Sequence, residues 1–322
     1  MHQTQQTQLR TAELGSTGMQ ITRVGFGAWA IGGGKWQFGW GPQDDDASIE
    51  TIHWALGLGV NWIDTAAAYG LGHSEEVVGR ALEGVDNRPY VFTKASLVPG
   101  PGGTVVNNLK RDSILREAER SLARLGVDAI DLYQIHWPRP VEDIDEGWSA
   151  LAELKEQGLV RHIGVSNFDV KQLERIQQIA PVETLQPPYS LINREVEHEL
   201  LPFAQRERIG VIAYSPMGSG LLTGAMTRSR IASLPEDDWR KRSEQFHEPQ
   251  LSRHLALVKR ITTVAERHDS TPGAVAVAWT LMNPAVDGAI VGLRRPGQVA
   301  AILGAANLEL SGDDLDTIEG RV

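Results

Sequence analysis

Two kinds of sequence segment alternate along the whole chain, and this alternation most constrains the fold. Short runs rich in β-branched and aromatic residues are each followed by a stretch with apolar residues about every 3.6 positions. The first three pairs are VGFGAW with DASIETIHWALGLG, VNWIDT with SEEVVGRALEG, and YVFTKA with RDSILREAERSLARLG. The order continues through IDLYQIH, HIGVS, VETLQ, IGVIAYSP and AIVGL. The pattern predicts eight strand–helix units.

Two α/β architectures accommodate such units. A closed (β/α)8 TIM barrel buries both faces of every strand and covers its outside with helices, which suits nearly continuous apolar strands. A doubly wound open sheet normally carries a glycine fingerprint after its first strand, whereas GAWAIGGG lacks a clean GxGxxG that opens a helix. We therefore expect a single barrel domain over residues 1–322. A glycine-rich turn within residues 11–24 predicts an N-terminal β-hairpin that caps the lower end of the barrel.

An extended loop interrupts the pattern after the seventh strand. Residues 225–250 are polar and charged, and they follow a strand whose loop often binds ligands in barrels. A mobile flap and a plain surface insertion are both open interpretations of this segment.

Composition and charge narrow the classes of partner. The chain has no cysteine, which excludes thiolate chemistry and fits a reducing cytoplasm, and no stretch approaches the ~18 apolar residues of a membrane span. A net charge of -10 argues against general attraction to nucleic acids or acidic membranes. We expect a soluble cytoplasmic protein with a small-molecule substrate, and we leave its oligomeric state open.

Four chemically active side chains fall at or just after the ends of consecutive strands. Asp64 ends the second strand and Tyr69 follows it, Lys94 ends the third strand, and His136 ends the fourth. Because the carboxyl ends of barrel strands meet on one rim, all four side chains are expected to share a pocket.

The expected chemistry of this group is proton donation to a carbonyl oxygen. Asp64 would neutralise Lys94, and the ammonium would lower the pKa of Tyr69 from about 10 toward the working range of a general acid. His136 would orient the oxygen that Tyr69 protonates. Each residue alone has a structural interpretation: a buried ion pair, a satisfied histidine, or a packed tyrosine. Their occurrence at consecutive strand ends favours catalysis.

Three motifs in this region resemble the aldo-keto reductase superfamily along nearly the entire chain: DTAAAYGLGHSEEVVG, VFTKAS and LYQIHWP. The overall pattern is similar to bacterial branches that include inositol- or stress-associated reductases and the oxidoreductase-like β subunits of potassium channels. The resemblance implies a nicotinamide-dependent barrel in which Asp64, Tyr69, Lys94 and His136 take the catalytic roles described above.

The resemblance also implies where the nicotinamide would lie. Ser166 and Asn167 would hold its carboxamide, and Gln186 would join them. Tyr214 offers an aromatic face for stacking on the ring. A helix cap at Asn167 and simple packing of Tyr214 are the structural alternatives.

Two further loops are candidates for the phosphates of the cofactor. Small residues in SPMGSGLLTG, residues 215–224, would let backbone amides approach a pyrophosphate, as similar family loops do. The residues predicted to contact the cofactor here are Ser215, Pro216, Met217, Gly218 and Ser219.

The segment VGLRRPGQ follows the eighth strand and is predicted to contact the cofactor through Gly292, Arg294, Arg295 and Gln298. The two arginines suit a 2′-phosphate, which favours NADP (NADPH) over NAD, although a solvated arginine pair is an alternative. The family often follows this glutamine with an acidic residue and an asparagine that reach the adenine, whereas this chain has Ala301 and Ile302. Looser binding of the adenine, and a replacement contact from the extended loop at residues 225–250, are therefore both open.

The substrate pocket is expected to be lined by Trp29, Trp36, Trp40 and Trp137. Aromatic walls suit aldehydes or ketones with flat or apolar bodies, but tryptophan also stacks on sugars, and the sequence does not choose between them.

We therefore expect an NADP-dependent oxidoreductase that reversibly reduces aldehydes or ketones to alcohols by hydride transfer. A cofactor-sensing regulatory subunit with slow turnover is the alternative from a different class. A lyase with Lys94 as Schiff-base nucleophile is less favoured, because an ammonium paired with Asp64 stays protonated. No close histidine pair supports a metal hydrolase, and we predict no metal site.

Overall fold

The computed structural model describes residues 8–321 of the chain. Eight parallel strands close into a barrel in which the last strand pairs with the first, so the predicted (β/α)8 architecture is confirmed. The strands are β3 (Val24–Gly27), β4 (Trp62–Asp64), β5 (Tyr90–Ala95), β8 (Ile130–Ile135), β9 (Val160–Ser166), β10 (Thr184–Gln186), β11 (Gly210–Ala213) and β12 (Gly288–Gly292).

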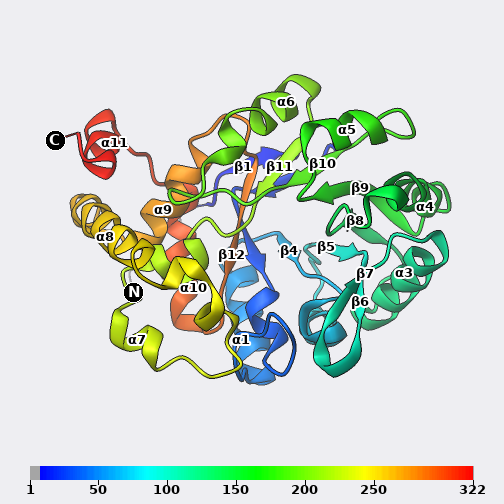
Figure 1. Cartoon of the computed structure of the whole chain (residues 1–322), viewed down its shortest axis with the longest axis horizontal. Helices are drawn as coiled ribbons and strands as arrows, with labels where there is room; N and C mark the ends of the chain where they lie inside the picture. Colours follow the sequence, from blue (N-terminus) through cyan, green and yellow to red (C-terminus); the bar gives the residue numbers. More distant parts are fainter. Residues whose placement is uncertain (1–7, 322) are drawn as a thin grey trace.

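Helices surround the strands, as Figure 1 shows. Those that follow the successive barrel strands are α1 (Asp45–Gly57), α2 (His73–Ala81), α3 (Arg111–Leu125), α4 (Ile144–Glu156), α5 (Val170–Ile176), α6 (Leu200–Glu207), α8 (Gln250–Arg267), α9 (Pro272–Leu281) and α10 (Pro296–Leu303), with α11 (Gly312–Glu319) near the C-terminus. Helix α6 begins at Leu200, after a 3-10 turn at Glu195–Glu197. Within residues 8–321, no helix combines the length and apolarity needed to cross a membrane.

The expected hairpin closes the N-terminal end of the barrel. Leu14 and Ile21 are fully buried and pack against Trp62 inside the barrel, together with other apolar strand residues. The hairpin therefore acts as an apolar plug opposite the strand ends that carry the candidate site. It consists of the antiparallel strands β1 (Thr11–Glu13) and β2 (Gln20–Thr22).

Toward the carboxyl ends of the strands, the barrel interior changes from apolar to polar. The lower layer is apolar and includes Trp62, Phe92, Leu132, Ile212 and Ile290. The upper layer consists of buried polar side chains: Asp64, Lys94, Gln134 and Gln186. Polar groups buried in this way need partners, because an unpaired one costs free energy. The polar and ionisable side chains of the barrel interior are therefore concentrated at the carboxyl ends of the strands, above an apolar layer.

The irregular loop after β11 is an insertion with its own small core. Ile231 and Phe246 are buried against Leu221 and Leu251. The insertion contains α7 (Arg228–Ala232), seen at the lower left of Figure 1, and two 3-10 turns, Trp239–Arg242 and Glu244–Phe246. The insertion joins the loop after β3 through a hydrogen bond from the backbone N–H of Trp239 to the Gly39 carbonyl, at 3.1 Å.

Candidate active site

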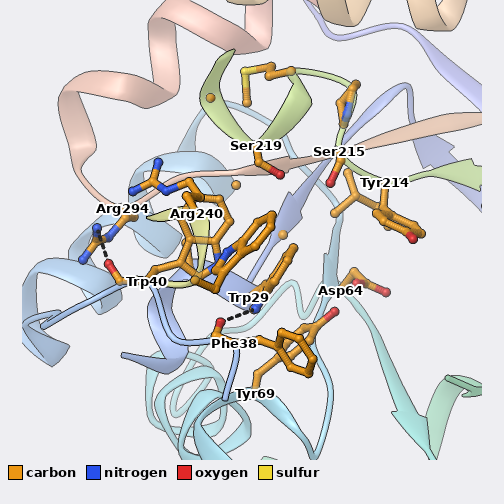
Figure 2. Close-up of a pocket in the computed structure, with 18 of the residues that line it drawn as sticks. Trp29, Phe38, Trp40, Asp64, Tyr69, Tyr214, Ser215, Ser219, Arg240 and Arg294 are labelled. Atoms are coloured by element: carbon orange, nitrogen blue, oxygen red, sulfur yellow. Dashed lines mark hydrogen bonds between the residues drawn. The ribbon is translucent and has the colours of Figure 1, made fainter. Parts of the chain in front are cut away.

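A cavity of about 460 Å³ opens at the carboxyl ends of the barrel strands. Asp64, Tyr69 and His136 line it, and Lys94 lies directly beneath, within hydrogen-bond distance of Tyr69. Figure 2 shows Tyr69 and Asp64 at one end of this pocket and Arg294 at the other. The four residues predicted to converge are therefore brought together.

Lys94 and Asp64 form a buried ion pair. Nζ of Lys94 lies 2.6 Å from Oδ1 of Asp64 and also donates to the Thr65 carbonyl at 2.9 Å. Burial raises the pKa of the Asp64 carboxyl and lowers the pKa of the Lys94 ammonium, while the ion pair opposes both shifts. Because the ammonium makes these contacts through its N–H groups, the pair fixes its position below the pocket floor.

Tyr69 presents its phenol to this ammonium. Its hydroxyl lies 3.3 Å from Nζ of Lys94, which donates to it. Burial, with a further contribution from the Asp64 charge, raises the pKa of Tyr69 well above 10, so the expectation that Lys94 would lower it is wrong. The Asp64 carboxylate holds the same ammonium at 2.6 Å, which is closer than the phenol at 3.3 Å. The phenol stays protonated, as a proton donor must be.

His136 faces the same space from the end of β8. Its ring lies edge-on to Tyr69, with ring centroids 5.7 Å apart and an interplanar angle of 81°. Burial and the Lys94 charge lower the pKa of His136 well below its ordinary value. The imidazole is therefore neutral at neutral pH, and it can offer a ligand oxygen one N–H without adding charge.

Two glutamines complete the surroundings of Asp64. Nε2 of Gln186 donates to Oδ2 of Asp64 at 2.8 Å, and the same nitrogen lies 3.4 Å from Oε1 of Gln134. Gln186 lines the pocket, as expected for a carboxamide ligand, but it also holds the second oxygen of the carboxylate. This link to Asp64 was not anticipated from the sequence.

Ser166, Asn167 and Tyr214 form a hydrogen-bonded wall of the pocket. The amide of Asn167 donates to Oγ of Ser166 at 3.0 Å and to the His136 carbonyl at 2.9 Å, and it accepts from the Tyr214 hydroxyl at 2.9 Å. Asn167 has a positive φ of 64° and does not cap the next helix, because Asp169 does so. The helix-cap alternative for Asn167 is therefore rejected.

The loop after β11 bends tightly beside this wall. Ser215, Gly218 and Ser219 all have positive φ, which folds the chain back on itself. Gly218 turns away from the cavity, where a Cβ would lie 2.7 Å from the Ile192 side chain. The predicted loop residues that line the cavity are Ser215, Pro216, Met217 and Ser219.

The segment after β12 reaches the other end of the cavity. Gly292, Arg294 and Gln298 line it, whereas Arg295 is exposed and is not part of the lining. Oε1 of Gln298 accepts from the backbone N–H groups of Arg294 and Arg295, at 2.8 and 3.1 Å. The position that the family often gives to an adenine contact is occupied by Ile302, which is buried in the core.

Arg294 also ties this segment to the loop after β3. Its guanidinium donates to the Trp40 carbonyl at 3.2 Å, to the Pro42 carbonyl at 2.6 Å and to Oε1 of Gln43 at 2.7 Å. Burial and the charge of Arg240 lower the pKa of Arg294. All three acceptors are uncharged. They satisfy the hydrogen-bond donors of Arg294 but do not neutralise its positive charge.

All four tryptophans predicted for the substrate pocket line the cavity: Trp29, Trp36, Trp40 and Trp137. A fifth, Trp239, comes from the insertion and stacks on Trp29, with ring centroids 5.3 Å apart and an interplanar angle of 16°. Arg240 lies over the Trp40 ring, 4.4 Å from its centroid. We call Trp29, Trp40, Trp239 and Arg240 the bridge.

Sequence reasoning missed Trp239 and Arg240. The insertion reads as polar, so its two bridge residues look like part of a solvated surface. In the structure Arg240 is buried because fully buried Asp238 holds it through two hydrogen bonds, at 2.6 and 2.9 Å. A tryptophan within an otherwise charged segment was the available signal, because a large aromatic ring rarely lies in a loop without a packing partner.

Together the barrel and its rim describe an oxidoreductase of the (β/α)8 class, with a protonated phenol poised at the mouth of an aromatic pocket. The family model described as "Aldo/keto reductase family" matches residues 23–321, and the chain therefore belongs to this family.

Individual relatives agree with this assignment. The chain is 39% identical to "Aldo-keto reductase YhdN" of Bacillus subtilis over 304 residues, covering 94% of this chain and 90% of that protein. It is 33% identical to the "NADH-specific methylglyoxal reductase" of Escherichia coli, over 95% and 96% of the two chains. Among solved structures, the glycerol dehydrogenase AKR11B4 of Gluconobacter oxydans superposes with a TM-score of 0.86 at 38% identity, covering 96% and 94%.

Proposed function

We propose that this protein reduces aldehydes or ketones to alcohols with NADPH, reversibly, and that Tyr69 is the general acid. The observation that carries the proposal is the 3.3 Å contact between the Tyr69 hydroxyl and Nζ of Lys94 at the edge of the cavity. A protonated phenol can give its proton to an oxygen that gains negative charge, and the ammonium then stabilises the phenolate that remains.

The lining of the cavity suits a dinucleotide. At one end, Asn167 and Tyr214 offer an amide and an aromatic ring, which suit a nicotinamide. At the other end, the tight turn at Ser219 and the guanidinium of Arg294 suit phosphates. When bound, the nicotinamide supplies the hydride. The residues of this chain hold the carbonyl oxygen, supply its proton and limit the access of water.

The choice of NADPH over NADH rests on charge. The charge of Arg240 lowers the pKa of Arg294, and the charge of the Asp238 carboxylate raises it. Two guanidinium groups beside one carboxylate leave a net positive charge, which favours a 2′-phosphate. The name of the Escherichia coli relative specifies NADH, so this choice needs a direct test.

The contacts of Lys94 also bear on the Schiff-base alternative. Its ammonium donates to Asp64, the Thr65 carbonyl and Tyr69. A nucleophilic amine needs a free lone pair, and an ammonium with three acceptors has none to offer. These contacts favour an electrostatic role for Lys94 over a covalent one.

The test is cofactor titration followed by turnover. We expect NADPH to bind more tightly than NADH, and a panel of carbonyls to be reduced in its presence. Tyr69→Phe should bind NADPH normally and lose turnover, while Tyr90→Phe, a matched change at the lower end of β5, should leave both intact. Carbonyl reduction that survives in Tyr69→Phe would remove the mechanism. Tight NADPH binding without turnover of any carbonyl would favour a cofactor-sensing subunit.

A further inference from the structure

We propose that Ser96 is a positioning residue, whose hydroxyl holds the backbone next to His136 and thereby keeps the imidazole in place against the carbonyl oxygen. This inference rests on the proposed function, because it concerns how a residue of the Tyr69 pocket is held there. Ser96 lies directly after β5 and does not line the cavity. Its hydroxyl therefore acts through His136 and not on the substrate.

The imidazole of His136 depends on its backbone for its orientation. Its Nδ1 atom is buried and has no hydrogen-bond partner among residues 8–321. A histidine in an active site is commonly oriented by a hydrogen bond that its second ring nitrogen makes. Because the described part of the chain offers no such bond, the place of the ring is set by packing, which includes Tyr69, and by the peptide units on either side of His136.

These peptide units are held from both neighbouring strands. On the side of β5, the His136 N–H donates to the Ala95 carbonyl at 3.0 Å. Oγ of Ser96 accepts from the Trp137 N–H at 3.3 Å and lies 3.4 Å from the Trp137 carbonyl, to which it can donate. On the side of β9, Nδ2 of Asn167 donates to the His136 carbonyl at 2.9 Å. That carbonyl and the Trp137 N–H belong to one planar peptide unit, which Ser96 and Asn167 therefore hold at both ends.

Both of the residues that hold this unit have a left-handed backbone. The φ angles are 82° at Ser96 and 64° at Asn167, in a region that residues other than glycine rarely adopt. Such a conformation costs free energy and persists only where the surrounding structure imposes it. Glycine would avoid this cost, but it has no side chain that could reach the His136 peptide unit. A strained serine at this place therefore indicates a role for its hydroxyl.

The strained backbone of Ser96 is fixed by two elements outside the cavity. Its N–H donates to Oε2 of Glu117 in α3 at 3.0 Å. Its carbonyl accepts at 3.0 Å from the N–H of Asn108, which directly follows β7 (Val105–Asn107). Ser96 is fully buried, so rotation of its backbone would break a buried hydrogen bond. Its Cα–Cβ bond is therefore fixed in direction, which keeps Oγ at the end of β8.

Two substitutions separate the hydroxyl from the backbone strain. Ser96→Gly removes both, whereas Ser96→Ala removes the hydroxyl and keeps a Cβ at the strained φ. We expect both variants to lose about tenfold in kcat, because a small misplacement of a catalytic group costs a large factor in rate. Their dissociation constants for NADPH should be unchanged. The midpoint of denaturant unfolding should be higher for Ser96→Gly than for Ser96→Ala, because glycine adopts a positive φ freely.

Equal losses of kcat at unequal stability would distinguish positioning from a purely structural role. The probe is the carbonyl compound that the wild-type protein reduces fastest, from a panel that includes methylglyoxal, the compound in the name of the Escherichia coli relative. Reduction is measured at saturating NADPH, so that kcat is separated from cofactor binding.

Arg208→Gly is the matched control. Arg208 directly follows α6 with a left-handed φ of 57°, and it is exposed and does not line the cavity. This substitution relieves the same kind of backbone strain without changing the surroundings of His136. The value of kcat should therefore remain that of the wild-type protein.

A double-mutant cycle tests whether Ser96 acts through His136. In a His136→Ala background no imidazole remains to be positioned, so Ser96→Gly should change the residual rate of carbonyl reduction very little. If Ser96→Gly cost the same factor in this background as in the wild-type protein, Ser96 would act elsewhere and the inference would be overturned.

The outcomes separate this inference from the proposed function. Wild-type kcat in Ser96→Gly, in a protein whose carbonyl reduction still requires Tyr69, would overturn the role of Ser96 and leave the reductase function intact. Weaker binding of NADPH at unchanged kcat would overturn that role as well. A wild-type protein that binds NADPH tightly and reduces no carbonyl of the panel would overturn the proposed function and this role together.

Discussion

Trp29 and Trp239 come from loops after different barrel strands, and their rings stack with centroids 5.3 Å apart. Trp40 completes the contact, with its ring edge-on to Trp239 at 5.8 Å. The bridge therefore spans the cavity between the loop after β3 and the insertion after β11. A dinucleotide that extends from Tyr69 to Arg294 would have to pass this bridge.

The first prediction concerns release of the cofactor past the bridge. Trp239→Ala should speed dissociation of NADPH by about fivefold, because loss of the ring contacts costs on the order of 1 kcal/mol. Stopped-flow fluorescence of bound NADPH measures this rate. Trp54→Ala, a change on the outer surface, is the control, and an unchanged rate in Trp239→Ala would show that the bridge does not retain the cofactor.

A second prediction separates stability from catalysis at the ion pair. Lys94→Met should lower the free energy of unfolding by about 3–5 kcal/mol, because it leaves the Asp64 charge buried and unpaired. Adding Asp64→Asn should restore much of this stability without restoring turnover. Chemical denaturation and steady-state assays give the two quantities. If the double variant regained activity, the ammonium would have no role in the chemistry.

A third prediction concerns pH, through a buried carboxyl outside the cavity. Glu117 accepts hydrogen bonds from the Ser96 N–H at 3.0 Å and from Oγ of Ser113 at 3.1 Å. Burial raises the pKa of Glu117 from 4.5 to about 7. Glu75 also raises this pKa, while Arg120 lowers it.

A raised carboxyl pKa means that the folded state holds the proton more tightly than the unfolded state. The contribution of Glu117 to stability is therefore fully present below pH 4.5 and is lost as the pH rises through about 7. Relative to Glu117→Gln, the protein should lose up to about 3 kcal/mol of unfolding free energy between pH 5 and pH 8. Denaturant titrations at both pH values check this. Glu119→Gln, an exposed change on the same helix, should show no such difference.

A fourth prediction concerns cofactor choice. Arg294→Met should weaken the binding of NADPH by about tenfold more than the binding of NADH. The reason is that a charge-assisted hydrogen bond to the phosphate contributes about 1.5–3 kcal/mol to binding. Arg295→Met should have a smaller effect, because Arg295 is exposed and does not line the cavity. Dissociation constants for both cofactors are needed. Equal weakening of NADPH and NADH in Arg294→Met would mean that Arg294 only anchors the loop after β3.

Local patterns in the sequence were sufficient to predict the barrel and the convergence of Asp64, Tyr69, Lys94 and His136 on one pocket. Strand periodicity places Asp64, Lys94 and His136 at strand ends, and parallel strands bring such ends to one rim. The sense of the Tyr69 pKa shift could not be predicted in this way. That shift depends on how completely the folded chain excludes water from the phenol and on the charge of Asp64, and neither is a local property of the sequence.

Long-range contacts account for the other differences. The guanidinium of Arg294 suggests a phosphate ligand from the sequence alone. In the structure it also donates hydrogen bonds to three uncharged acceptors in the loop after β3. Gln186 reads as a ligand residue and also binds Asp64, which lies on a strand across the barrel. Trp239 lies in a polar segment and finds its partner on another loop. In each case the deciding neighbour is remote in sequence.

The apolar plug that includes Leu14 and Ile21 determines from which end of the barrel substrates can enter and products can leave. Because that end of the barrel is filled by side chains, we expect the dinucleotide and the carbonyl compound both to enter from the carboxyl ends of the strands, where the cavity opens. We expect the larger dinucleotide to lie along the floor of the cavity, with the carbonyl compound above its reactive ring. We therefore expect a compulsory order, in which the dinucleotide enters before the carbonyl compound and leaves after the alcohol.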